Sequence, residues 1–216
     1  MKNKGLFIVI EGVDGSGKST QAQKLAEWLE NKTGVKTIRT AEPFILRELI
    51  LGRKDLCALS ELLLFLADRA EHVNKIIMPA IKSGFNIICE RYNDSTLAYQ
   101  SGGHEIEFSH VKNLITACKF PEPDIKIFLD LPPEIAFERV KARNNLNDKF
   151  EAEGLALIKK VSDFYRSYYS TSYLLPPTSY LLTINCGNLD EEQTFKAIIS
   201  NINSLLEEFF NGRHSS

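Results

Sequence analysis

The sequence predicts an α/β fold in which five parallel strands form one sheet with helices on both of its faces. Short apolar runs typical of buried strands alternate with longer segments of helical periodicity along the 216 residues. The first elements follow the order strand, glycine-rich turn, helix and strand. This order makes a βαβ unit, and therefore a parallel sheet with right-handed crossovers. One core suffices for this length, so we expect a single domain over residues 1–216.

The bounds of each expected element follow from where its apolar pattern begins and stops. Gly34 fits the C-terminal cap of the first helix, and Pro132 and Pro133 fit the start of a later one. Gly102 and Gly103 predict a break after a short helix. We expect strands over 7–10, 35–40, 85–89, 125–131 and 180–185. We expect helices over 18–32, 58–82, 108–119, 151–169 and 190–209, a helical stretch within 44–56, a short helix that carries Tyr99 and Gln100, and a helix after Pro132 that carries Glu138, Arg139, Lys141 and Arg143.

Composition and charge narrow the class of protein. Hydrophobic residues make up 44% and charged residues 25%, which is usual for a soluble globular domain. A formal net charge of -2 predicts no nucleic-acid partner. No apolar stretch is long enough to cross a bilayer, and the four cysteines form no C-x-x-C pair. We therefore expect a cytoplasmic enzyme with no membrane partner and no zinc or disulfide framework.

The first strand runs into a phosphate-binding loop. Residues 12–19 fit G-x-x-x-x-G-K-[ST], with a buried-type strand before the motif and an amphipathic helix after it. Consecutive backbone N–H groups at the positive end of a helix suit a triphosphate, the lysine reaches its outer phosphates, and the serine hydroxyl suits Mg²⁺. The expected ATP site comprises Gly12, Val13, Asp14, Gly15, Ser16, Gly17, Lys18, Ser19 and Thr20, together with Arg139.

Two further places carry side chains that suggest a site. On the long helix, Phe65 and Arg69 lie one turn apart, about 90° around from the apolar stripe, and could face a cleft beside the core. Periodicity alone leaves open that Phe65 is more core and that Arg69 is a solvated charge. Glu90 and Arg91 follow the third strand, where ligands of open parallel sheets bind. An exposed ion pair is the alternative there.

The distribution of arginines favours a kinase over a GTPase switch. Arginines occur at four separate places, 69, 91, 139 and 143, and no Asp-x-x-Gly water-positioning element follows a second strand. Phosphoryl transfer needs positive charge along the whole in-line path. Residues 144–149 are polar and without periodicity, so we expect a mobile lid at about 142–154 that excludes water.

With these motifs in place, the chain resembles the thymidylate kinases of the nucleoside monophosphate kinase superfamily, which share the P-loop NTPase architecture. The resemblance covers nearly the whole chain, and its Phe-x-x-x-Arg and Ala-Tyr-Gln elements are the most discriminating. It rests on Glu11 to Thr20, Glu42-Pro43, Leu64 to His72, Arg91-Tyr92 with Ser95-Thr96 and Ala98-Tyr99-Gln100, and Pro123-Asp124 with Leu129 to Pro133.

The resemblance implies a role for each matching position. Phe65 would stack on thymine, Arg69 would donate to a thymine carbonyl, and Asp14 would face the acceptor's 3′-hydroxyl and phosphate. Arg91 would hold the acceptor phosphate and stabilise the transferring group, while Ser19 and Glu90 would serve Mg²⁺. The implied acceptor site is Glu42, Phe65, Arg69, Arg91, Ser95, Thr96, Tyr99 and Gln100, and the implied catalytic residues are Asp14, Lys18, Arg91, Arg143 and Lys149.

The sequence departs from the family pattern at several positions. Gly15 leaves the phosphate loop without an arginine, so the extra cation is expected from Arg143 and Lys149 of the lid, as in the bacterial lid-type enzymes. Lysine at position 149 gives up the bidentate geometry of arginine. Ala41 replaces the arginine usual before Glu-Pro, and Arg39 or Arg47 could substitute for it. Glu90 stands where aspartate is usual and is one methylene longer.

The expected activity is therefore transfer of phosphate from ATP to dTMP, with Mg²⁺. Thymidylate kinases are typically homodimers, so a homodimer is also expected. A deoxyribonucleoside kinase is the first alternative, because such enzymes share a Glu-Arg pair at this strand end. The second is a nucleotide-binding relative whose activity is reduced by Ala41 and Glu90.

Overall fold

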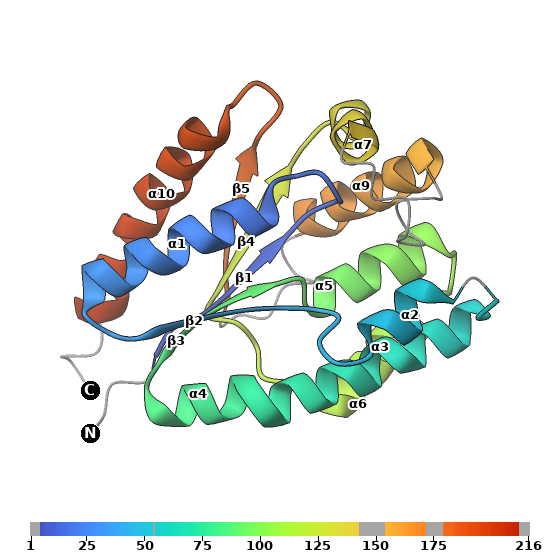
Figure 1. The fold of residues 1–216 in the computed structure, drawn as a ribbon, viewed down its shortest axis with the longest axis horizontal. Coiled ribbons are helices and arrows are strands. Elements are labelled where there is room, and N and C mark those ends of the chain that lie inside the picture. The colour runs from blue at the N-terminus through green and yellow to red at the C-terminus, as the bar shows by residue number, and fades with distance from the viewer. Residues whose placement is uncertain (1–4, 54, 143–153, 172–178, 212–216) are drawn as a thin grey trace.

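Five parallel strands form the sheet that the sequence predicts. Figure 1 shows the computed structural model of the chain, which describes residues 5–53, 55–142, 154–171 and 179–211. The order across the sheet is β2-β3-β1-β4-β5, so that β1 lies at the centre. The strands are β1 (Phe7–Glu11), β2 (Thr37–Ala41), β3 (Asn86–Glu90), β4 (Ile125–Asp130) and β5 (Tyr180–Asn185).

Helices cover both faces of the sheet, as predicted (Figure 1). Alternate residues of β1 point to opposite faces. Ile8 and Ile10 belong to the apolar cluster that contains Leu25 of α1, whereas Phe7 and Val9 pack with Ile77 in a second cluster. The helical elements are α1 (Lys18–Thr33), α2 (Arg47–Gly52), α3 (Ala58–His72), η1 (Val73–Ile77), α4 (Met78–Ser83), α5 (Asn93–Thr96), η2 (Leu97–Gly103), α6 (Phe108–Cys118), α7 (Pro133–Ala142), α9 (Gly154–Ser170) and α10 (Glu191–Asn211).

The glycine pair at 102 and 103 forms the end of the short helix, at the place where the sequence predicts a break. Both residues lie within the π-helical turn η2, which continues α5. A Cβ atom at Gly102 would lie 2.6 Å from the Cβ of Phe164, and one at Gly103 would lie 2.7 Å from Cδ1 of Leu157. The glycines are therefore required because η2 packs closely against α9. Helical structure runs without a gap from Ala58 to Ser83, as expected for 58–82, although its middle part, η1, is a π-helical turn.

The carboxyl ends of the three strands on one side of the sheet meet at one edge. Ile10 pairs with Glu90, and Ala41 also pairs with Glu90. The backbone N–H of Glu42 donates to the Glu90 carbonyl at 3.0 Å. This register brings the ends of β1, β2 and β3 together, where a parallel sheet places its ligands.

In the described part of the chain, no helix combines the length and the apolar character needed to span a bilayer.

Most of the predicted lid at 142–154, including Arg143 and Lys149, lies outside the described residues. The lid therefore stays a prediction.

Candidate active site

The phosphate loop connects β1 to α1 and takes the backbone path that its glycines allow. Gly12, Gly15 and Gly17 have φ angles of 145°, 84° and 92°, a region that L side chains rarely adopt. Lys18 Nζ donates to the carbonyls of Gly12 at 2.9 Å and Val13 at 2.8 Å. The lysine is thereby folded back over the loop that it belongs to.

The absence of an arginine at position 15 has a structural reason. A Cβ atom on Gly15 would lie 2.5 Å from the carbonyl oxygen of Ala136 in α7, and the φ angle of 84° adds strain for any side chain. Arg139, also on α7, reaches the same place, since its Nη1 lies 3.4 Å from the Gly15 carbonyl oxygen. The loop and α7 are thus in contact, and Arg139 lies beside the loop.

Arg91 joins the end of β3 to the phosphate loop. Its guanidinium forms a short ion pair with Asp14 and lies 3.2 Å from the Tyr99 hydroxyl, over whose ring it stacks at 5.0 Å. Tyr99 in turn donates to Asp14 at 2.8 Å. Burial raises the pKa of Asp14, but Arg91, Lys18 and the Tyr99 hydroxyl outweigh it and lower the pKa to about 2. Asp14 is therefore an anion at neutral pH and holds Arg91 beside the loop.

Ser19 and Glu90 provide an oxygen pair that fits a divalent cation. The Ser19 hydroxyl at the start of α1 donates to Glu90 Oε2 at 2.5 Å. Both side chains line the cavity described below. A hydroxyl and a carboxylate oxygen are the ligands that Mg²⁺ prefers, and the longer side chain of glutamate still brings its carboxylate to the serine.

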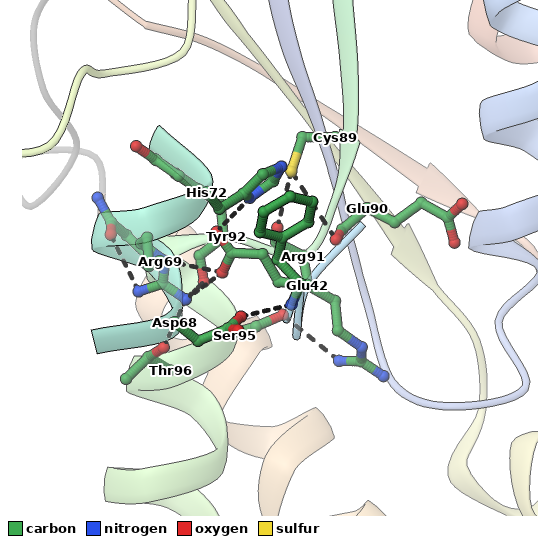
Figure 2. Close-up of polar contacts among 12 residues, drawn as sticks. Glu42, Asp68, Arg69, His72, Cys89, Glu90, Arg91, Tyr92, Ser95 and Thr96 are labelled. Atoms are coloured by element: carbon green, nitrogen blue, oxygen red, sulfur yellow. Dashed lines mark hydrogen bonds and ion pairs between the residues drawn. The ribbon is translucent and has the colours of Figure 1, made fainter. Parts of the chain in front are cut away.

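Arg69 is the centre of a buried polar network beneath the acceptor side (Figure 2). Its side chain is 1% exposed and binds one oxygen of Glu42 through Nε at 2.8 Å and Nη2 at 2.6 Å. Nη2 also donates to the Tyr92 carbonyl and the Thr96 hydroxyl, and Nη1 donates to Asn93. Arg69 is therefore not the solvated charge that periodicity left open. It fixes the segment after β3 against the segment after β2.

His72, which lies three residues after Arg69 on α3, completes this network. His72 Nδ1 lies 3.0 Å from the second Glu42 oxygen, and its Nε2 lies 2.7 Å from the Thr40 hydroxyl. Ligand atoms of Glu42, His72 and Cys89 lie within 4.8 Å of one another. Both Glu42 oxygens are already bonded, and the positive Arg69 contacts one of them. We therefore interpret the cluster as a hydrogen-bond network rather than a metal centre.

One cavity of about 580 Å³ unites the predicted donor and acceptor residues. All eight predicted acceptor residues line it. Of the predicted ATP site, Gly12, Val13, Ser16 and Arg139 stand outside the lining. The lining residues are Asp14, Gly15, Gly17, Lys18, Ser19, Thr20, Arg39, Ala41, Glu42, Pro43, Arg47, Leu51, Phe65, Arg69, Glu90, Arg91, Ser95, Thr96, Tyr99 and Gln100.

Sequence reasoning missed the buried carboxylate that holds the backbone after Arg91. Glu11 is fully buried and accepts hydrogen bonds from the backbone N–H of Tyr92 at 2.9 Å, from Ser95, and from the Tyr165 hydroxyl at 2.9 Å. Burial and the nearby Asp94 raise the pKa of Glu11. A charged residue at the end of an apolar strand was the available signal. Tyr165, on α9, had no local signal at all.

The comparisons with known proteins agree on one family. A model of the thymidylate kinase family matches residues 10–178. The chain is 43% identical over 177 residues to a thymidylate kinase of Prochlorococcus marinus, an alignment that covers 76% of this chain and 82% of the relative. A probable thymidylate kinase of Pyrococcus horikoshii is 44% identical over 158 residues, which cover 67% of this chain and 74% of the relative. The crystal structure of a thymidylate kinase from Ehrlichia chaffeensis matches with a TM-score of 0.70 and 29% identity over 93% of this chain and 98% of that one.

Proposed function

The chain belongs to the thymidylate kinase family, and we propose from this membership that it transfers the γ-phosphoryl group of ATP to dTMP, giving ADP and dTDP. The family confirms the resemblance in the sequence. The observation that carries the proposal is the shared cavity, in which the phosphate loop and the predicted acceptor residues face one space. Donor and acceptor phosphates bound there would be held close together, which removes much of the entropic barrier to transfer.

The donor phosphates are assigned to the loop between β1 and α1. Backbone N–H groups at the start of α1 would bind the phosphate oxygens, because this end of a helix carries partial positive charge. Lys18 would leave the carbonyls of Gly12 and Val13 for the outer phosphates, since it gains a stronger, charged partner there. Arg139 beside Gly15 would contribute to the same ATP site.

Ser19 and Glu90 are the residues that would hold Mg²⁺ beside these phosphates, since their oxygens already meet at 2.5 Å. A bound Mg²⁺ supplies charge neutralisation between the two outer phosphates of the donor. The protein's own contribution is to fix the two oxygens at the ends of α1 and β3.

Arg91 is assigned to the phosphoryl group in transfer. Its guanidinium lies between the loop and the acceptor wall, where negative charge spreads over the equatorial oxygens in the transition state. Asp14 and Tyr99 hold it there before substrate arrives, so little reorganisation is needed. No general base is required, because the acceptor phosphate is already a nucleophile at neutral pH. The lack of need for a general base distinguishes the proposed reaction from that of a nucleoside kinase, which must deprotonate a neutral hydroxyl.

The acceptor base is assigned to the wall formed by α3, α5 and η2. Phe65 is half-buried and lines the cavity, as a ring that stacks on thymine must. Arg69, held by Glu42 and Thr96, forms the floor beside it. Arg39 and Arg47 also line the cavity and are the described cations that would replace the arginine missing at position 41. Arg143 and Lys149 stay the predicted lid cations.

A panel of acceptors tests the function. We expect ADP release with ATP and Mg²⁺ to be fastest with dTMP, slower with dUMP, and negligible with dCMP, UMP and thymidine. Turnover of thymidine without turnover of dTMP would replace the proposal with a deoxyribonucleoside kinase. Binding of ATP and dTMP in a calorimeter without product from any acceptor would instead support a nucleotide-binding relative of reduced activity.

Two further expectations stay proposals. A homodimer and a cytoplasmic location were predicted from the sequence and the family resemblance. The exposed apolar side chains of the α2 and α3 region are the surface that supports the homodimer.

A further inference from the structure

Glu61 on α3 is a buried carboxylate that touches the acceptor wall through one residue. Its side chain is fully buried, and its Oε1 accepts a hydrogen bond from Nε2 of Gln100 at 3.0 Å. His104 Nε2 lies 3.4 Å from the same oxygen. Gln100 is also fully buried in the fold, yet it lines the cavity assigned to the acceptor. Glu61 also lies one helical turn before Phe65, so α3 carries both side chains to this wall.

The contact with Glu61 decides which way the Gln100 amide is turned. An amide has a donor end and an acceptor end, and it is the donor end of Gln100, Nε2, that binds the Glu61 oxygen. The NH₂ group therefore faces Glu61, and the Oε1 atom is the end of the amide that Glu61 does not bind. Among the described residues, Gln100 Oε1 is buried and has no hydrogen-bond partner. A buried acceptor without a partner is costly, so a ligand that donates to it gains affinity.

The neighbouring polar groups cannot distinguish a hydrogen-bond donor on the ligand from an acceptor in this way. Arg69 can only donate, and its position is fixed by Glu42, Tyr92 and Thr96. The Thr96 hydroxyl accepts from Arg69, but a hydroxyl can turn its own proton toward either kind of partner. Glu61, which lies outside the cavity lining, therefore determines whether Gln100 offers a donor or an acceptor to the cavity.

We propose that Glu61 is a specificity-determining positioning residue, which holds the Gln100 carbonyl toward the acceptor base so that a pyrimidine with an N3–H group is accepted and one with an unprotonated N3 is rejected. This rests on the proposed function, because the base concerned is that of dTMP. Thymine carries a donor at N3, whereas cytosine carries an acceptor there. An acceptor that faces another acceptor leaves both unpaired in a buried site, which is a strong basis for rejection.

The test compares dTMP with 5-methyl-dCMP, which keeps the methyl group and differs in the hydrogen-bonding edge of the base. Affinities for both nucleotides are measured by calorimetry with the wild-type protein and with Glu61→Gln. A glutamine at position 61 can accept or donate, so the Gln100 amide is free to turn. We expect the preference for dTMP over 5-methyl-dCMP to fall by about tenfold or more in Glu61→Gln.

A matched control is Glu71→Gln, the same change on the same helix at a residue that pairs with Lys75 on the surface. It should leave the preference within about twofold of wild type. A purely structural role for Glu61 would weaken both nucleotides alike and leave their ratio unchanged, which would overturn the proposal. Urea denaturation of each variant measures its folding separately.

The exchanged double variant Glu61→Gln with Gln100→Glu covers the case in which the single variant does not fold. The amide at position 61 then donates to the carboxylate at position 100, whose other oxygen again offers an acceptor to the base. We expect this variant to prefer dTMP as wild type does, and an equal affinity for both nucleotides would contradict the inference. If wild-type protein binds neither nucleotide, the proposed function fails rather than the role of Glu61.

Discussion

Arg91 lies in the left-handed region of backbone conformation, with a φ angle of 65°, although it is not a glycine. Such a conformation costs on the order of 1–2 kcal/mol for an L residue. It persists because hydrogen bonds hold the backbone on both sides. The Arg91 N–H donates to the Ile10 carbonyl at 3.0 Å, and the Tyr92 N–H donates to Glu11 at 2.9 Å. The strain turns the guanidinium toward Asp14 and the loop, so we interpret it as part of the catalytic arrangement.

The titration of Lys18 should be visible when nucleotide binds. Burial, and then the positive Arg91, lower the pKa of Lys18 to about 7, although Asp14 and Glu11 oppose them. The ammonium of the nucleotide-free protein is therefore mostly deprotonated at about pH 8.5, and a triphosphate raises its pKa again. We expect ATP binding at that pH to take up about one proton, measured by calorimetry in two buffers of different ionisation enthalpy. Below about pH 6 the lysine is already charged and contributes no uptake.

Two variants on α1 separate this effect from other protonation events. Lys18→Met should bind ATP more weakly and without the proton uptake. Lys24→Met changes a lysine of the same helix that pairs with Glu191, and it should keep the uptake. Equal binding heats in both buffers for the wild-type protein would show that Lys18 stays protonated without nucleotide.

Residue identities could be predicted from the sequence where a local pattern carries them. The glycine spacing fixes the phosphate loop, and the carboxyl end of a strand identifies Glu90 and Arg91. Partners from distant segments could not be predicted in this way. Arg69 contacts groups that follow β2 and β3, and Glu11 meets a tyrosine 154 positions away. Such contacts depend on the packing of the whole chain, which periodicity does not describe.

At the scale of elements, α3 organises the acceptor side through polar residues on successive turns. Glu61 contacts Gln100, Asp68 binds the loop after β2, and Arg69 and His72 bind Glu42. The Asp68 carboxylate, 1% exposed, accepts from the backbone N–H groups of Ile45 and Leu46 at 2.7 Å, and from that of Phe44. These bonds shape the segment that leads from Glu42 to Arg47.

Asp68→Asn should loosen that segment without unfolding the protein. The neutral amide forms weaker hydrogen bonds and turns one donor toward the backbone donors. We expect a loss of about 1–3 kcal/mol in the free energy of unfolding, measured in urea. We also expect weaker binding of dTMP with little change for ATP, because the segment borders the acceptor end of the cavity.

Asp163→Asn is the matched control, since Asp163 is exposed on α9. It should change the free energy of unfolding by less than about 0.5 kcal/mol and leave both affinities unchanged. Equal losses of ATP and dTMP affinity in Asp68→Asn would instead mean that the carboxylate supports the whole fold.

Element types were predictable because their apolar periods are long and regular, and the five parallel strands are confirmed. The π-helical turns η1 and η2 were not predictable from these periods. Gly102 and Gly103 correctly indicated the end of the short helix, but not the contact that they make with Phe164 and Leu157 of α9, more than fifty residues away. A glycine signals a missing side chain and does not say whether a turn or a neighbouring helix requires it.

At the scale of the whole molecule, the distribution of exposed apolar side chains is uneven. Four of the six large ones in the described residues lie in the α2 and α3 region, namely Ile45, Leu49, Leu59 and Leu63, with exposed fractions of 41–55%. Ile45 and Leu49 are four positions apart, as are Leu59 and Leu63, and α2 packs against α3. The two helices lie side by side at one end of the molecule in Figure 1. Clustered apolar exposure of this kind is typical of an interaction surface.

We therefore expect the homodimer to form through α2 and α3, with Leu59 and Leu63 in the contact. Leu59→Asp with Leu63→Lys should shift the sedimentation coefficient from that of a dimer to that of a monomer, because burying those charges against a second copy is costly. Ile135→Glu, at an exposed apolar residue of α7, is the matched control and should stay dimeric.

Because α2 and α3 also carry Arg47 and Phe65, the monomeric variant should require more dTMP for half-maximal turnover while its ATP requirement changes little. A wild-type protein that sediments as a monomer over a wide concentration range would contradict the assignment, and a double variant that stays dimeric would place the interface elsewhere.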